Sequence, residues 1–397
     1  MIRILLVPSS DYIGHPFPQR HNQIFERLND GKDFEVHVVR FRLFENLKLK
    51  THLCVHELPG SPRLGVAGYY MTNMLGHVFE IRKIVRDEGI DLVVLSNLAA
   101  PFAYVLSNEL SSRKVPTILD LPDYYPTSAT GYILDVGSFP GKLLAGSLDL
   151  MLRYMTRRSS AVTAASKGLL RYAQVCGARD AFHIPNGIAE EFLKLHDGKS
   201  IREKFGFAKD DIVVGYIGSV DFWLDFGALL RGMALAKKKG LKIKGLFVGK
   251  GLHKQVYSDR VTTWIMQEKL EGEITRLDFV PYKDVPAYVA ALNVGTIPFD
   301  VGNPTAHYAA PNKMWEYFSQ MKPVISTPIP EALDNLDCVS LALEPADYVN
   351  HLLAVYSGDN EVSQKVEKGY HKAYRNSWKK AADSFAAVCK RVFKERG

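Results

Sequence analysis

Short runs rich in Val, Ile and Leu alternate with longer helical patterns along most of the chain. Strands of a parallel sheet are buried on both faces and read as nearly continuous apolar runs, so this alternation predicts parallel sheets built from strand-helix-strand units. Helical patterns fall at 19–28, 70–87 and 142–156. The predicted strands are 3–9, 34–41, 51–58, 91–97, 116–121, 161–166 and 181–185, followed by 212–219, 242–251, 274–280, 293–299, 323–327 and 338–343.

The succession of strands pauses once, where Asn186-Gly187 marks a turn. At 397 residues the chain is also too long for one ordinary hydrophobic core. We therefore predict an α/β protein of two facing, doubly wound Rossmann-like domains, residues 1–188 and 189–375, with a cleft between them. The last stretch, 376–397, is an amphipathic helix that we expect to pack back on the first domain. Its apolar side carries Trp378, Ala382, Phe385, Val388, Cys389 and Val392.

Composition and charge limit the classes of partner. Hydrophobic residues make up 47% of the chain and charged residues 23%, as expected of a folded globular protein. The formal net charge of +7 favours an anionic partner such as a nucleotide, a nucleic acid or a membrane surface. Because the basic residues are scattered without interleaved stacking aromatics, no nucleic-acid module is predicted.

The cysteines and the apolar segments bear on the compartment. No two cysteines form a C-x-x-C pair, so neither a zinc site nor a disulfide framework is predicted. The cysteines are Cys54, Cys176, Cys338 and Cys389. The apolar run at the amino terminus is too short for a signal peptide, and no run reaches the roughly 18 apolar residues of a membrane span. We expect a cytoplasmic protein, with contact to the inner face of a membrane left open.

The stretch "APNKMWEYFSQMKPVIST", residues 310–327, is the most informative local pattern. Pro311 suits the first position of a helix, which places Lys313 in the first turn, where the positive helix end disfavours a cation unless an anion is bound. Lys313 and Glu316 are neighbours on one face, and Met314, Tyr317 and Phe318 form the packing face. The lysine could then bind a diphosphate and the glutamate could accept hydrogen bonds from ribose hydroxyls. The alternative is a solvated ion pair.

The same stretch resembles the donor-binding segment of GT-B nucleotide-sugar glycosyltransferases of the family-4-like group, whose pattern is Ser/Ala-Pro-x-Lys-x-x-Glu-Tyr followed by Lys-Pro-Val-Ile. Further stretches follow in the family's order: "HIPNGI" (183–188), "VGYIGSVDFWLDFGALLRGMA" (214–234), "LFVGKG" (246–251) and "FVPYKDVPAYVAALNVGTIPF" (279–299). The resemblance is firm over about residues 180 to 330 and looser over the first domain. It implies a GT-B fold and transfer of a sugar from a nucleoside diphosphate sugar to a hydroxyl acceptor, without a metal ion or other cofactor.

The resemblance also implies a donor site and a class of acceptor. Lys313 would bind the diphosphate and Glu316 the ribose, and the acceptor would be a glycan or lipid-linked glycan in polysaccharide or glycoconjugate synthesis. Lys250 is a weaker phosphate candidate, with a solvated loop lysine as the alternative. The remaining expected donor contacts are Gly14 in the first domain, Gly218 and Ser219 near the phosphates, Tyr282 beside the base, Asp300 on the donor sugar, and Asn312.

The sequence departs from the family's pattern at several positions. Many retaining relatives have a Glu-x7-Glu pair whose second member corresponds to Glu316, but the first position here is Tyr308. Ser219 and Asp225 stand where many relatives have an Arg and a Lys, and Asp225 could instead cap the following helix. The sequence therefore leaves open whether transfer retains or inverts the anomeric configuration.

The first domain is expected to carry the acceptor and any general base. Asp120 and Asp123 follow a predicted strand, and an inverting transferase needs a base such as a carboxylate with a raised pKa. They could instead position sugar hydroxyls or form a simple turn. Gly14 would permit close approach of a ligand to the loop after the first strand. Three histidines lie in loops that could reach substrate, namely His15, His21 and His307.

Residues 143–160 form a basic amphipathic pattern that could lie on anionic lipid, or a helix buried on one side with its arginines in solvent. Two other functions remain open at this stage. A nucleotide-sugar epimerase of similar fold would process the donor without an acceptor. A non-catalytic GT-B subunit would bind a nucleotide sugar or glycan and support a partner.

Overall fold

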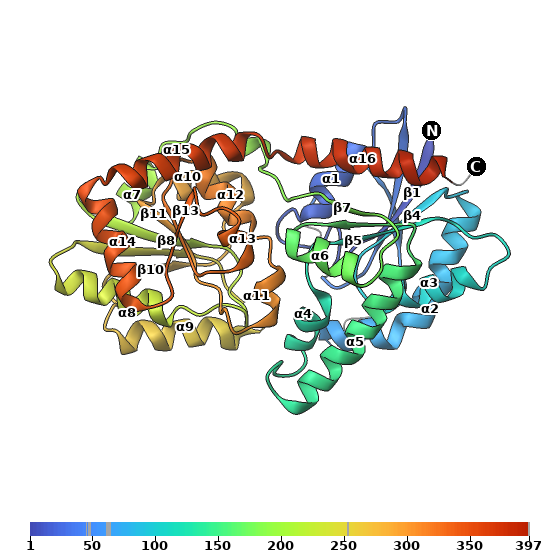
Figure 1. Ribbon diagram of the computed structural model, residues 1–397, viewed down its shortest axis with the longest axis horizontal. Coiled ribbons are helices and arrows are strands. Elements are labelled where there is room, and N and C mark those ends of the chain that lie inside the picture. Colours follow the sequence, from blue (N-terminus) through green and yellow to red (C-terminus); the bar gives the residue numbers. More distant parts are fainter. Residues whose placement is uncertain (45, 47–48, 61–64, 252–253, 396–397) are drawn as a thin grey trace. The chain divides into compact units, whose positions relative to one another are not determined.

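The computed structural model describes residues 1–44, 46, 49–60, 65–251 and 254–395 (Figure 1). The chain forms two compact units. The N-terminal unit comprises Met1–Asn186 and Trp378–Gly397, and the C-terminal unit comprises Gly187–Ser377. The division falls within the Asn-Gly turn that the sequence marks as the pause between two sets of strands.

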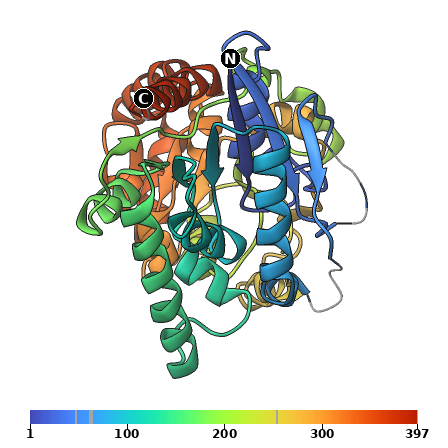
Figure 2. The same cartoon turned by 90° about the vertical axis from the view of Figure 1, so that its right-hand side faces the viewer.

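The N-terminal unit contains a seven-stranded parallel sheet of order β3-β2-β1-β4-β5-β6-β7. Figure 2 shows β3 as its outermost strand. The strands are β1 (Ile2–Val7), β2 (Phe34–Arg40), β3 (Cys54–Glu57), β4 (Leu92–Leu95), β5 (Thr117–Leu121), β6 (Ala161–Ala164) and β7 (Ala181–His183). The helices are α1 (Arg20–Leu28), α2 (Gly65–Asp87), α3 (Ala99–Glu109), α4 (Tyr125–Gly131), α5 (Phe139–Arg158), α6 (Lys167–Val175) and α16 (Trp378–Lys394).

The C-terminal unit contains a six-stranded parallel sheet of order β10-β9-β8-β11-β12-β13. Its strands are β8 (Ile212–Ile217), β9 (Ile243–Val248), β10 (Ile274–Leu277), β11 (Val294–Ile297), β12 (Val324–Ser326) and β13 (Val339–Leu341). The helical segments are η2 (Glu190–Phe192), α7 (Lys199–Lys204), α8 (Gly227–Lys238), α9 (Gln255–Gln267), η3 (Tyr282–Asp284), α10 (Val285–Ala290), α11 (Pro304–Tyr308), α12 (Asn312–Ser319), α13 (Pro330–Leu333), α14 (Pro345–Ser357) and α15 (Asn360–Tyr374).

Each predicted strand overlaps one of these strands, so the prediction of two doubly wound Rossmann-like sheets is confirmed. The central strands are apolar because helices cover them on both faces, and β4 and β8 are buried at every position. The predicted helix at 142–156 begins earlier, at Phe139. The Ser138 side chain caps α5 by accepting a hydrogen bond from the Gly141 backbone N–H, and Pro140 suits the first turn.

The C-terminal helix α16 lies in the N-terminal unit, where it packs against α1. Phe385 is fully buried there, and its ring meets the Phe25 ring of α1 edge to face at a centroid distance of 5.1 Å. An aromatic pair of this kind adds about 0.5–1.5 kcal/mol to the free energy of unfolding beyond the burial of its area. In the described part of the chain, no helix is both long enough and apolar enough to cross a bilayer.

Candidate functional site

The loops that follow β8 and β11 leave the second sheet where the strand order reverses, because β9 continues the sheet from β8 and β12 continues it from β11. Ligands of doubly wound sheets bind at such switch points. Gly218, directly after β8, has a φ of +142°, which favours glycine. A Cβ added to Gly249, after β9, would lie 2.0 Å from the Gly218 carbonyl oxygen. The two glycines therefore let the loops pack backbone against backbone.

Helix α12 is fixed against this end of the sheet by its buried side, which carries Met314, Tyr317 and Phe318 as predicted. The Tyr317 hydroxyl accepts a hydrogen bond from the Ile217 backbone N–H at 3.0 Å. Its ring lies over Gly295 of β11, where an added Cβ would be 2.4 Å from the ring. Because glycine leaves that space free, α12 lies close to β8 and β11.

Lys313 lies in the first turn of α12, beside the Gly218 loop. An added Cβ at Gly218 would be 3.1 Å from Lys313 Cε, and Nζ lies 5.0 Å from the ring centroid of Tyr216 and 5.5 Å from that of Phe299. Desolvation lowers the pKa of Lys313 to about 8, although the charge of Glu316 opposes the shift. Among the described residues, no carboxylate forms an ion pair with Lys313. A recessed cation without a carboxylate partner at a helix N-terminus is suited to an anionic ligand.

Glu316 lies one turn after Lys313 on α12. The Tyr282 hydroxyl, from η3, donates a hydrogen bond to Glu316 Oε1 at 3.2 Å. Burial raises the pKa of Glu316 to about 7, while the Lys313 charge and the Tyr282 hydrogen bond act in the opposite direction. The carboxylate is thus anchored at one oxygen and retains acceptor capacity for a hydroxyl group. The structure brings together four predicted donor contacts, which are Gly218, Tyr282, Lys313 and Glu316.

Other predicted donor residues have partners within the protein. Lys250 is about half exposed and forms an ion pair with Asp278 at 2.6 Å, which favours its alternative interpretation as a solvated loop lysine. Asp300 Oδ1 accepts a hydrogen bond from the Gly302 backbone N–H at 2.9 Å and so stabilises the turn after β11. The Ser219 carbonyl accepts a hydrogen bond from the Tyr216 hydroxyl.

Two polar side chains beside these loops have a buried oxygen without a hydrogen-bond partner among the described residues. One is Asn312, the first residue of α12, through Oδ1. The other is Asp221, also through Oδ1, and burial raises the pKa of its carboxyl group to about 7. Sequence reasoning missed Asp221, and its only signal was its position in the loop that follows β8. Asp225 Oδ1 accepts a hydrogen bond from the Gly227 backbone N–H at 2.8 Å just before α8, but the N-cap residue of this helix is Phe226 and not, as predicted, Asp225.

In the N-terminal unit, Asp120 differs from the expected catalytic base. It is fully buried at the end of β5, where its carboxylate accepts hydrogen bonds from Arg20 Nε at 3.1 Å and His21 Nε2 at 3.1 Å. Thr163 Oγ1 donates a third at 2.7 Å. Burial alone would raise the pKa of Asp120, but the Arg20 charge and these hydrogen bonds hold it well below its usual range. A carboxylate stabilised in its ionised form is a poor general base, so this environment suits a residue that holds Arg20 and His21 in place better than one that takes a proton.

Asp123 keeps the property expected of a base. Burial raises its pKa, and its Oδ1 accepts a hydrogen bond from the Tyr124 backbone N–H at 2.7 Å. It lies between β5 and α4, in the loop at the carboxyl end of the strand. Asp123 therefore remains the candidate for a general base in the N-terminal unit.

Gly14 and the predicted histidines are placed by contacts within the protein. A Cβ at Gly14 would lie 2.4 Å from Asp11 Oδ2, so this glycine accommodates Asp11, and the approach of a ligand there stays a prediction. His15 is buried, and its Nδ1 is hydrogen-bonded to the Phe17 carbonyl at 2.9 Å. His307 is exposed on α11.

Comparison with solved structures identifies the architecture. No known family model and no curated protein matches the sequence. The structure is similar to sucrose-phosphate synthase from Thermosynechococcus elongatus at 12% identity, with a TM-score of 0.78 over 100% of both chains. The chain has the GT-B fold. It is similar to Anabaena Alr3699/HepE in complex with UDP and glucose, at 17% identity and a TM-score of 0.75 over 98% of this chain and 100% of that one. WaaG, a glycosyltransferase involved in lipopolysaccharide biosynthesis, is similar at 12% identity and a TM-score of 0.67 over 97% of this chain and 99% of that one.

The Gly218 turn of this GT-B chain gives a first prediction. Gly218→Ala introduces a Cβ at a φ that L-residues rarely adopt and presses it against Lys313, so we expect the free energy of unfolding to fall by roughly 1–3 kcal/mol. Gly272→Ala is the matched control, because an added Cβ there meets nothing within 4 Å. Urea denaturation of both variants measures the difference, and equal midpoints would contradict the strain assigned to Gly218.

Proposed function

We propose that the protein is a glycosyltransferase that moves a sugar from a nucleoside diphosphate sugar to a hydroxyl group of a glycan or lipid-linked glycan. The observation that carries the proposal is the recessed Lys313 at the start of α12, beside the Gly218 turn and one helical turn before Glu316. A diphosphate would supply the negative charge that this lysine lacks among the described residues. The UDP and UDP-glucose complexes of HepE support a nucleotide sugar as the donor.

The proposed chemistry places positive charge at the leaving group. Lys313 Nζ and the backbone N–H groups of the first turn of α12 would bind the diphosphate oxygens, where negative charge grows as the glycosidic bond breaks. Glu316, held by Tyr282, would accept hydrogen bonds from the ribose hydroxyls. Since Lys313 supplies the charge and the sequence has no Asp-x-Asp motif, we propose that transfer proceeds without a metal ion.

The acceptor would be activated by the N-terminal unit. In an inverting reaction, Asp123 would take the proton of the acceptor hydroxyl, because a carboxyl group with a raised pKa is a stronger base than a solvated one. Asp120 would keep His21 and Arg20 in place through its buried hydrogen bonds. In a retaining reaction these residues would position the acceptor only.

The test is a calorimetric screen of UDP, GDP, ADP and CDP with their sugar nucleotides, followed by mass spectrometry of glycan products. UDP comes first because HepE was solved with it. We expect micromolar binding of one nucleotide and product formation only when acceptor is added. Interconversion of donor sugars without acceptor would indicate an epimerase, and tight donor binding without turnover would indicate a binding subunit. No nucleotide binding at all would reject the proposal.

The pKa of Lys313 predicts how nucleotide binding depends on pH. A diphosphate binds the protonated amine of Lys313. Nucleotide affinity is therefore at its maximum below the pKa of about 8 that this lysine has in the free enzyme, and it falls as pH rises through that value. Well above that value the decrease approaches about tenfold per pH unit, because each binding event then requires uptake of one proton. Calorimetry at pH 9 in two buffers of different ionisation enthalpy measures this uptake. A flat profile between pH 7 and 9.5 would contradict the role of Lys313.

A lipid-linked acceptor is favoured by exposed apolar side chains on α2 and α5. Met71, Leu75 and Phe79 recur every four residues on α2 and are 73%, 76% and 70% exposed. On α5 the exposed apolar residues are Phe139, Leu143 and Leu150. Such stripes are typical of helices that lie in a membrane interface. The sequence-based expectation centred on the α5 arginines, but Arg153 is ion-paired with Asp149, and the exposed apolar residues now carry the proposal.

We therefore predict binding to vesicles of anionic phospholipid. The double variant Leu75→Glu/Phe79→Glu should bind at least about tenfold more weakly, because each side chain loses the roughly 1.5–3 kcal/mol of a buried large apolar group. Met266→Glu is the matched control, since Met266 is an exposed apolar residue on α9 of the other unit. Co-sedimentation measures the affinities. Equal binding by wild type and double variant would exclude the α2 stripe as the contact.

A further inference from the structure

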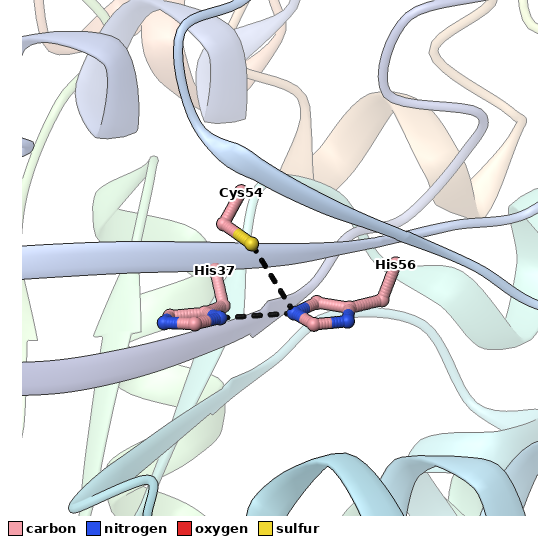
Figure 3. A group of neighbouring side chains, drawn as sticks. All are labelled: His37, Cys54 and His56. Carbon is pink, nitrogen blue, oxygen red and sulfur yellow. Dashed lines mark hydrogen bonds between the residues drawn. The ribbon is translucent and has the colours of Figure 1, made fainter. Parts of the chain in front are cut away.

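Two histidines and a cysteine meet at the edge of the N-terminal sheet, far along the chain from the predicted donor residues. β2 and β3 pair in parallel, with His37 opposite Cys54 and Val39 opposite His56. Because side chains alternate along a strand, Cys54 and His56 point to one face of β3, and His37 points to the same face of β2. Figure 3 shows the three side chains directed toward one another.

The potential ligand atoms of these three residues lie within 4.8 Å of one another. Cys54 Sγ is 3.6 Å from His56 Nε2, and His37 Nδ1 is 2.9 Å from the same nitrogen. The two imidazole rings are stacked with an interplanar angle of 13°. His37 is buried, His56 is partly exposed and Cys54 is exposed, so the cluster opens to solvent on one side.

These distances are close to those of a tetrahedral zinc site. Bond lengths of about 2.3 Å to sulfur and 2.0–2.1 Å to nitrogen separate a sulfur and a nitrogen ligand by roughly 3.5 Å, and two nitrogen ligands by roughly 3.3 Å. The Cys54–His56 distance already agrees, the two histidine nitrogens need to part by about 0.4 Å, and the potential ligand atoms of Cys54 and His37 lie within 4.8 Å of one another. Nitrogen and sulfur ligands favour Zn²⁺, whereas Mg²⁺ and Ca²⁺ require oxygen.

We propose that His37 Nδ1, Cys54 Sγ and His56 Nε2 bind one Zn²⁺ ion, with the fourth coordination position facing solvent. An independent feature supports this arrangement. His37 Nε2 is buried without a hydrogen bond among the described residues and lies 3.7 Å from Glu35 Oε1. Metal-binding histidines commonly direct their second nitrogen to a carboxylate, which fixes the ring for coordination.

The proposed ion would connect an edge strand to its neighbour. β3 is the outermost strand of the sheet, and its ladder with β2 spans only the four residues Cys54–Glu57. A metal held by both strands would fix their register. This role is separate from the proposed sugar transfer, which assigns no function to these residues. The sequence has no C-x-x-C motif and gave no hint of this metal site, because the proposed ligands come from two strands that become neighbours only in the folded sheet.

The test uses full-length protein freed of metal with a chelator and then titrated with Zn²⁺ in competition with a chromophoric chelator. We expect one ion per chain. Cys54→Ser and His56→Gln should each weaken the affinity by more than about 100-fold, and Glu35→Gln by about 10- to 100-fold. His52→Gln is the matched control, because His52 is a 65% exposed histidine on the same segment and should leave the affinity unchanged.

Cobalt provides a second measurement that reports the ligands directly. Co²⁺ in the wild-type protein should give a thiolate-to-metal charge-transfer band and the strong visible bands of a tetrahedral site, and Cys54→Ser should lack the charge-transfer band. Cys54 is exposed, so this variant is expected to fold, as circular dichroism will verify. A stoichiometry near zero, or Zn²⁺ affinity and cobalt spectra indifferent to Cys54→Ser, would overturn the proposal.

Discussion

Replacing Lys313 with Met is expected to abolish nucleotide binding and to reduce glycosyl transfer by at least about 10²- to 10³-fold, the usual effect of removing one preorganised electrostatic stabiliser. Methionine is apolar and of similar length, so it retains packing against the rings of Tyr216 and Phe299 while removing the charge. The free energy of unfolding should stay constant or increase, since the variant removes a recessed charge without an ion-pair partner among the described residues. A residue that costs stability and is needed for activity is typical of a binding site.

Calorimetry with the preferred nucleotide, initial rates and thermal denaturation measure these three effects. Lys250→Met is the control, because Lys250 was also a phosphate candidate but its ammonium group is paired with Asp278 at the surface. We expect it to bind nucleotide almost as the wild type does. If Lys313→Met unfolds more easily and binds nucleotide normally, the lysine is structural and the donor-site proposal fails.

The strands and α12 were predictable because their signals are local. Apolar runs mark strands that are buried on both faces, and α12 carries its packing residues at helical spacing around Lys313 and Glu316. The family resemblance placed Tyr282 and Glu316 in one donor site, beside the base and the ribose, but it did not predict the hydrogen bond between them. That bond joins residues 34 positions apart.

The Asp120 network and the His37 cluster could not be predicted, because strand order creates them. Asp120 and Arg20 are 100 residues apart in the sequence. Arg20 begins α1, which follows β1, and Asp120 lies on β5. The fold brings them together because only β4, which pairs with both β1 and β5, separates these two strands in the sheet. The sequence indicated a carboxylate after a strand, but it could not indicate that a buried guanidinium neutralises it. His37 and His56 likewise become neighbours only through the parallel register of β2 and β3. Asp221 was missed for a simpler reason, which is that a single aspartate in a loop has no pattern.

Asp120→Ala should lower the free energy of unfolding of the N-terminal unit by about 3–5 kcal/mol, because it leaves the buried Arg20 and His21 without their shared carboxylate. Asp120→Asn retains the shape and part of the hydrogen bonding, so its loss should be smaller. The matched control is Asp210→Ala, since the Asp210–Lys242 pair is at the surface and should leave the transition nearly unchanged. Hydrogen exchange of β5 amides localises the effect to this unit.

The loss of folding stability at low pH tests the same hydrogen-bond network, because its direction follows from the pKa shift of Asp120. The pKa of Asp120 is lower in the folded chain than the value of about 3.9 expected when unfolded, so its contribution is present above that pH and is lost as pH falls through the folded value. Wild-type stability should therefore decline below about pH 4, and Asp120→Asn should show a shallower decline because it has no carboxylate to protonate. Parallel acid limbs in wild type and Asp120→Asn would mean that the carboxylate is not held ionised by Arg20 and His21. In that case Asp120 would regain its place beside Asp123 as a candidate base.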